Sequence, residues 1–169
     1  PALALAELEP DGLEALWRNL QGGPATAKEV DTHWRLLHGV LITRARLHRF
    51  GHAPEPDCIF CGEVDSVSHA YFACEYSRSY VEEVRQALCS SLSPAFSPAT
   101  FSSTQLLLGL PALAALVDKA VKPTLRAVVA ITIQTLHDTR HSRIRSLHPT
   151  TTSLAPSSLA MVALQRLSN

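Results

Sequence analysis

The chain has 169 residues, a formal net charge of zero at neutral pH and 46% hydrophobic residues, so it can bury the core of one domain without disulfides. It has no apolar run long enough to span a membrane, and residues 1–6 lack the basic start and long apolar centre of a signal peptide. Zero net charge argues against wrapping nucleic acid through overall basicity, and the cysteine pattern favours metal binding in a reducing compartment over a disulfide framework. We therefore expect an intracellular protein, in the nucleus or cytoplasm, with no membrane partner. Because the chain begins with proline, we also expect it to be a segment of a longer protein.

Two helices are predicted before residue 42. Between residues 11 and 20 apolar side chains recur at helical spacing, and Gly22-Gly23-Pro24 then ends the pattern. Thr26 and Glu29 form a capping-box pattern, in which the hydroxyl and the carboxylate each accept a hydrogen bond from a free backbone amide. This pattern opens a second helix, whose apolar positions continue to Leu41.

The next segment alternates short helices with extended chain. Thr43 can cap a short third helix, which Gly51 ends, and the prolines in residues 52–56 then favour extended backbone. Ser66 can cap a brief helix that contains His69. We expect these short, capped elements to lead the chain to a site rather than to form a core.

The second half of the chain is also predicted to be helical. A longer amphipathic helix is expected from about residue 77 to 88, and residues 90–104 are rich in Ser, Thr and Pro and predict a loop. A helix is expected over 110–121, and Pro123 suits the first turn of the next one. Because residues 127–131 are apolar on every face, we expect this last helix at the centre of the core.

One motif combines metal-ligand residue types with metal-ligand spacing: Cys58-x2-Cys61-x7-His69-x4-Cys74, with Gly62 after the second cysteine. Two residues between thiolates let one tight turn direct both sulfurs at one ion, and a glycine relieves crowding after that turn. His69 near the start of a helix and Cys74 just beyond its end can reach the same point.

Four such ligands close a tetrahedral shell, which is typical of structural rather than catalytic zinc. The motif therefore predicts one structural Zn2+ ion, with Cys58, Cys61, His69 and Cys74 as its ligands. The alternative is that these are ordinary buried cysteines and a core histidine. Cys89 lies outside the motif, and a small core residue is its expected role.

These elements predict a mainly α fold, a small helical module organised around one CCHC structural zinc knuckle. We expect residues 1–92 to form the helical zinc-binding region, 93–104 a loop, and 105–148 a helical hairpin packing on that region. Residues 149–169 are expected to be a Thr/Ser/Pro-rich linker, 149–158, followed by a short helix, 159–167.

Basic side chains gather in two segments on either side of the acidic motif region. Residues 32–54 contain no acid, and their arginines are candidate phosphate contacts, with solvation as the equal alternative: Arg35, Arg44, Arg46 and Arg49. Nearby histidines can also contact phosphate, although a solvated helix face is their expected role: His33, His38, His48 and His52. The cations from Arg140 to Arg145 are expected to stabilise the C-terminal end of a helix.

The motif and the helix before it resemble a known family. The residues Trp34-Arg35-Leu36-Leu37-His38-Gly39, Leu41-x-Thr43-Arg44-Ala45-Arg46-Leu47, Pro54-x-Pro56-x-Cys58-x2-Cys61-Gly62 and His69-x4-Cys74 are similar to the zinc-binding domain of reverse transcriptases. That domain lies near the carboxyl end of proteins encoded by non-LTR (LINE-like) retrotransposons. The resemblance covers roughly residues 13–84. A weaker similarity at 130–145 lacks the tryptophan of the family's Trp-x-x-Arg signature and reads Leu136-His137-Asp138-Thr139-Arg140.

The resemblance implies a non-catalytic accessory module, carried beside a polymerase, that binds RNA or DNA. The chain itself has no Asp-Asp pair of the polymerase type and no cluster of acids suited to two-metal chemistry. A domesticated protein-protein interaction module with a purely structural zinc is the alternative. An independent enzyme would rest only on Cys89 and scattered histidines.

Overall fold

The computed structural model describes residues 24–92, 102–109, 119 and 122–146, and this part of the chain is built from helices. Its elements are α2 (Ala27–Leu37), α3 (Arg44–Arg49), the short π-helix η2 (His69–Ala73), α4 (Glu75–Leu92), α5 (Ser103–Leu108) and α7 (Lys122–Arg145). The extended pairing within these residues is one isolated antiparallel bridge between Asp57 and Val64. The mainly α fold predicted from the sequence is confirmed.

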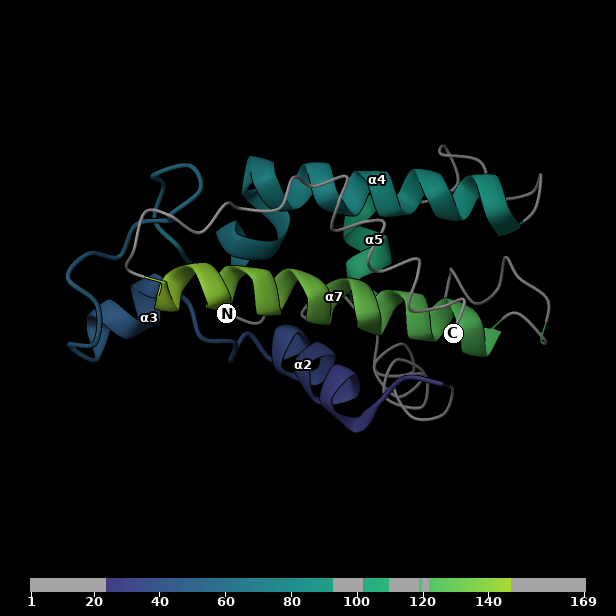
Figure 1. Ribbon diagram of the computed structural model, residues 1–169, viewed down its shortest axis with the longest axis horizontal. Coiled ribbons are helices and arrows are strands. Elements are labelled where there is room, and N and C mark those ends of the chain that lie inside the picture. Colours follow the sequence, from purple (N-terminus) through teal and green to yellow (C-terminus); the bar gives the residue numbers. More distant parts are fainter. Residues whose placement is uncertain (1–23, 93–101, 110–118, 120–121, 147–169) are drawn as a thin grey trace.

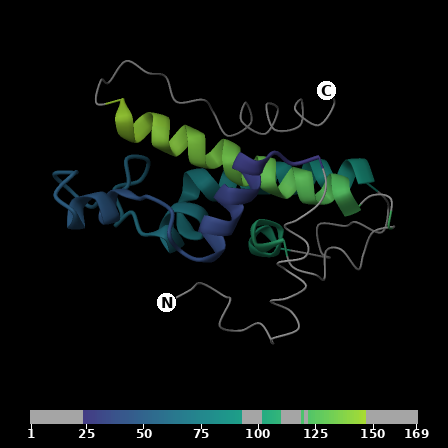
Figure 2. The ribbon, with the colours of Figure 1, turned by 90° about the horizontal axis from the view of Figure 1, so that it is seen from below.

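Helix α7 forms the centre of the described fold, as its apolar sequence predicts. In Figure 1 it crosses the molecule between α4 and α2, and Figure 2 shows α5 nearly end-on beside the same bundle. The helices α2, α4 and α5 all contact α7, and every residue from Ala127 to Leu136 is buried. The main core cluster joins side chains of α7, such as Val129 and Ile133, to Leu36 of α2 and Tyr80 of α4.

Helix α2 begins as its sequence predicts but ends earlier. The Thr26 hydroxyl accepts from the Glu29 amide at 3.4 Å, and the Glu29 carboxylate accepts from the Thr26 amide at 2.7 Å, so the capping box is present. The helix ends at Leu37, and Gly39 follows with φ 64°. The prediction that the helix continues to Leu41 was therefore wrong, because the chain turns at Gly39. Leu41 is nevertheless buried in the core.

Helix α3 has the bounds that its caps predict. The Thr43 hydroxyl accepts from the Arg46 amide at 3.4 Å, and the helix ends at Arg49, ahead of Gly51 with φ 74°. None of its own residues is buried. The helix therefore adds an exposed turn of chain rather than core.

Helices extend into both ends of the Ser/Thr/Pro-rich stretch 90–104, whose composition predicted a loop. Helix α4 continues to Leu92, beyond the predicted end at residue 88, and α5 begins at Ser103. Ser102 and Gln105 form a capping box, so a serine that suggested a loop by composition begins a helix instead. The helices predicted at 11–20, 110–121 and 159–167, and the linker at 149–158, lie outside the described residues.

Within the described residues, none of the helices combines the length and apolar character that crossing a lipid bilayer requires.

Candidate metal centre

Residues 56–66, here called the knuckle, fold into a tight loop that carries the first two candidate ligands. The Cys58 amide donates to Glu63 O at 2.6 Å, the Gly62 amide donates to Cys58 O at 2.8 Å, and the Asp65 amide donates to Pro56 O at 2.9 Å. Gly62 has φ 83°, in the left-handed region that favours glycine. A Cβ at this position would meet nothing within 4 Å, so the glycine is favoured by its left-handed backbone and not by the crowding that the sequence analysis gave as the reason.

The other two candidate ligands lie at the ends of η2. The Ser66 hydroxyl accepts from the His69 amide at 3.0 Å, as its predicted capping role requires, and the Cys74 amide donates to His69 O at 2.7 Å. In an α-helix a residue five positions later is rotated by about 140°. The wider i→i+5 turn of a π-helix instead returns Cys74 toward the side that His69 occupies.

The two pairs meet at one point. One ligand atom from each of Cys58, Cys61, His69 and Cys74 lies within 4.8 Å of all the others. The Cys74 sulfur lies 3.9 Å from the Cys58 sulfur and 3.9 Å from the Cys61 sulfur, and Cys61 Sγ lies 3.1 Å from His69 Nε2.

These distances suit a metal shell better than a disulfide. Tetrahedral zinc with Zn–S bonds of about 2.3 Å separates two sulfurs by about 3.8 Å, whereas a disulfide needs about 2.0 Å. All three cysteines are free thiols in the structure. Three sulfurs and one imidazole nitrogen form the donor set of a closed structural zinc site, so the cluster can hold one zinc ion.

The buried sulfurs share a hydrogen bond that separates their acidities. This bond lowers the pKa of Cys74 to about 6 and raises the pKa of Cys58 to about 12. The nearby Arg140 guanidinium lowers both values, and desolvation raises both. These opposite pKa shifts favour the proton on Cys58 over the proton on Cys74. Metal binding has to displace the proton on Cys58, because only the thiolate is a zinc ligand.

Asp65 and Arg140 flank the cluster and were not predicted as parts of it. They form an ion pair, and Arg140 Nη2 also donates to Cys58 Sγ at 3.4 Å. Arg140 was expected among cations at a helix end, and it does lie near the C-terminal end of α7, but it is 3% exposed and pairs with Asp65. Arg143 and Arg145 do lie in the last turn of α7, as expected. The one sequence signal at Arg140 was the weaker family similarity at residues 130–145, in which the Trp-x-x-Arg signature lacks its tryptophan.

The four candidate phosphate contacts do not share one environment. Arg35 is exposed and pairs with Asp31 at 2.8 Å, and Arg49 is exposed with its guanidinium 5.3 Å from the Phe50 ring centroid. On α3 the i,i+3 residues Arg46 and Arg49 share a face. Arg44 lies on the opposite side by helical geometry, and its amide donates to Asp65 at 2.8 Å.

The histidines divide in the same way. His38, His48 and His52 are exposed, as expected, and the His38 ring lies 4.1 Å from the Trp34 ring. His33 is 4% exposed, so neither a solvated face nor a phosphate contact describes it. Its position on the buried side of α2 explains the error. Cys89 is partly buried against the core cluster.

Fold and site together define a small helical zinc-binding module. Comparison with known proteins then finds a family for this segment: the family model described as zinc-binding in reverse transcriptase matches residues 13–80, which include all four cluster residues. Residues 13–80 therefore carry a zinc-binding domain of the reverse-transcriptase type, and the resemblance noted in the sequence is confirmed.

A transposon protein contains a related segment. The "Transposon TX1 uncharacterized 149 kDa protein" of Xenopus laevis is 39% identical over 64 residues, which are 38% of this chain and 5% of that protein. No solved structure matches the chain. The similarity therefore covers a small part of the longer relative.

Proposed function

We propose that Cys58, Cys61, His69 and Cys74 bind one structural zinc ion, in a non-catalytic accessory module of a retrotransposon-derived reverse-transcriptase protein. The observation that carries this proposal is the convergence of all four ligand atoms within 4.8 Å, inside the matched segment. Zinc in a closed shell of this kind supplies folding free energy rather than a reactive water. It would tie the knuckle to η2.

The same module is proposed to bind RNA or DNA through the α2–α3 surface, defined by Trp34, Arg35, Arg46, Arg49 and Phe50. These side chains combine positive charge with aromatic rings, and Trp34 and Phe50 are 43% and 58% exposed. Arginine contacts phosphate without regard to sequence, and exposed rings stack on unpaired bases. The surface therefore suits a single strand.

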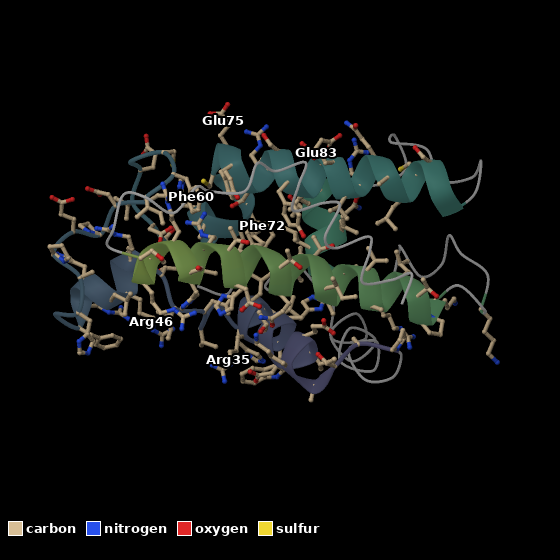
Figure 3. The ribbon with its side chains drawn as sticks, in the orientation of Figure 1. Arg35, Arg46, Phe60, Phe72, Glu75 and Glu83 are labelled. Atoms are coloured by element: carbon tan, nitrogen blue, oxygen red, sulfur yellow. The ribbon has the colours of Figure 1, made fainter. Side chains whose placement is uncertain are left out.

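The distribution of charge supports this choice of face. In Figure 3, Arg35 and Arg46 lie along one edge of the molecule, and Glu75 and Glu83 on α4 lie along the opposite edge. A chain of zero net charge can still attract phosphate when its charges separate in this way. Binding is expected to be weak and strongly dependent on salt.

A salt series tests the nucleic-acid proposal. Binding of labelled single-stranded RNA and of duplex DNA to the zinc-loaded chain is measured by fluorescence anisotropy between low and physiological salt. Arg46→Gln with Arg49→Gln should weaken binding and reduce the slope of log affinity against log salt by about 1.4 for a single strand. Arg78→Gln on α4, also exposed, is the matched control and should leave the slope unchanged. No detectable binding at the lowest salt would rule out this role.

A second candidate is a protein-interaction module, which four exposed apolar side chains favour. Trp34, Val40, Ile42 and Phe50 lie within one short segment and remain exposed. A docking protein would cover them. Ile42→Ser with Phe50→Ser distinguishes the two functions: loss of a stoichiometric, nuclease-resistant protein complex with unchanged RNA affinity favours the interaction module.

A further inference from the structure

Arg140 is a charged side chain buried near the C-terminal end of α7, where that helix reaches the knuckle (Figure 1). Its guanidinium pairs with Asp65, and these side chains are 4% and 1% exposed. It also donates to Ser77 Oγ at 3.2 Å and to Cys58 Sγ at 3.4 Å. The Phe60 ring lies beneath it, 5.1 Å from the guanidinium carbon. Contacts of the guanidinium thus reach the knuckle and the first turn of α4.

The partners of Arg140 are themselves fixed in place. Asp65 accepts from the Arg44 amide at 2.8 Å with its other oxygen, and Ser77 donates to Ala70 O at 2.6 Å. An isolated buried charge is costly, and an ion pair offsets that cost only when good geometry and further hydrogen bonds satisfy both groups. Arg140 Nη2 donates to Asp65 Oδ1, and Arg140 Nη1 donates to Ser77 Oγ. The second hydrogen of the same Nη2 is available to the Cys58 sulfur, to which it donates at 3.4 Å.

We propose that Arg140 is a positioning residue of the metal centre, which donates a hydrogen bond to the Cys58 thiolate, neutralises charge around the loaded cluster and so slows the loss of zinc. The proposal rests on the ligand assignment made above. Zn2+ with three thiolates and a neutral imidazole carries one net negative charge, and Asp65 adds a second in the same buried region. Arg140 supplies the buried positive charge. Groups around a metal shell commonly change affinity ten- to a hundredfold.

The Arg140 contacts also extend the zinc-binding unit along the chain. The family match ends at residue 80, whereas Arg140 lies 82 positions after Cys58 in sequence. The metal centre is therefore completed by α7, which is also the centre of the core. Stability of the knuckle and docking of α7 are linked through this one side chain.

The test uses two readouts, because loss of a purely structural ion pair could also speed zinc release but would leave the environment of the sulfurs unchanged. Arg140→Met alone would leave Asp65 buried without its cation, so the variant to study is Arg140→Met with Asp65→Asn, in which the amide oxygen can still accept from Arg44. Arg145→Met, at an exposed position of the same helix, is the matched control. Zinc release from each full-length chain is followed with a chromophoric chelator. The cadmium-113 chemical shift of the cadmium-loaded proteins reports the electronic environment of the sulfurs.

We expect the double variant to fold, to release zinc at least tenfold faster and to shift the cadmium signal, while Arg145→Met changes neither. An unchanged cadmium shift in the folded double variant, or an unchanged rate of zinc release, would overturn the proposal. Should that variant not fold, Arg140→Lys provides the test, because lysine keeps the charge without the planar fork. Faster release from it supports the role of the fork, and release at the wild-type rate contradicts it. A wild-type chain that holds no stoichiometric zinc would instead refute the ligand assignment.

Discussion

His33 is a histidine inside the core, at the contact between α2 and α5. Its ring makes hydrogen bonds to the backbone of Leu107 and Leu108, and its Nε2 has no hydrogen-bond partner. Desolvation by burial lowers the pKa of His33 to about 4, against the opposing effect of the two backbone contacts. The imidazole is therefore neutral in the folded protein at pH 5, where an unfolded chain would hold it protonated.

This difference predicts a loss of stability in acid. Because the folded-state pKa lies below the unfolded value of 6.5, the unfolded chain binds more protons between pH 6.5 and about 4, and stability falls as pH decreases through that range. His33→Gln, which keeps a donor for the Leu107 and Leu108 backbone, should remove about 2 kcal/mol of the decrease between pH 7 and pH 5. Denaturant unfolding in excess zinc measures it, with the exposed His48→Gln as control. Equal pH dependence in all three proteins would contradict the assigned pKa.

The two polar residues that sequence analysis misplaced, His33 and Arg140, fail for the same physical reason. Their partners, Leu107 and Asp65, are distant in the sequence, and no local sequence pattern predicts a contact over such separations. The cluster residues were predictable because ligand chemistry requires a particular set of residue types at short spacing. A buried charged side chain can pair with a residue from any part of the chain, and the fold determines which residue that is.

At the scale of elements, local signals explain where helices begin better than where they end. Thr26, Thr43 and Ser102 each accept a hydrogen bond from an amide of the first turn, and the first two were identified from the sequence. The end of α4 at Leu92 was not, because a Ser-rich composition does not separate a helix end from a loop. Hydrogen bonds to capping side chains set where a helix begins, whereas tertiary packing can extend a helix past its local sequence pattern.

Gly109 offers a test of how α5 is joined to α2. It ends α5 with φ 58°, and a Cβ at this position would lie 3.2 Å from His33 Cε1 and 3.6 Å from Val129 Cγ1. Gly109→Ala should therefore lose about 1–2 kcal/mol from the left-handed backbone, plus the cost of displacing a core side chain.

Gly39 is the matched control for that substitution. Its φ is 64°, but a Cβ there meets nothing within 4 Å, so Gly39→Ala should lose the backbone cost alone. Urea unfolding of the two variants gives the difference directly. Similar losses would show that His33 moves away freely and that the α2–α5 contact is loose.

At the scale of the whole molecule, the described fold has two parts with different sources of stability. The core of α2, α4, α5 and α7 buries large apolar side chains, including Leu36, Tyr80, Leu106 and Ile133. The knuckle buries only Cys58 and Asp65 among its residues. The sequence predicted both parts, a helical core from apolar periodicity and a metal site from ligand spacing. It could not predict that α7 connects them, because that link depends on the buried pair of Arg140 with Asp65.

This division predicts the result of removing zinc. A chelator should expose the knuckle, because little apolar burial would then oppose its chain entropy, whereas the α7 core should persist. Hydrogen exchange followed by mass spectrometry should show loss of protection in peptides that contain the amides of Cys58, Gly62 and Asp65, which are hydrogen-bonded within the knuckle. Peptides covering Val129 to Ile133 should keep most of theirs. Restoring zinc, but not magnesium, should restore the knuckle amides, since thiolates select the softer ion. Equal loss in both regions would mean that the metal holds the entire fold, and no loss in either would mean that the knuckle stands without it.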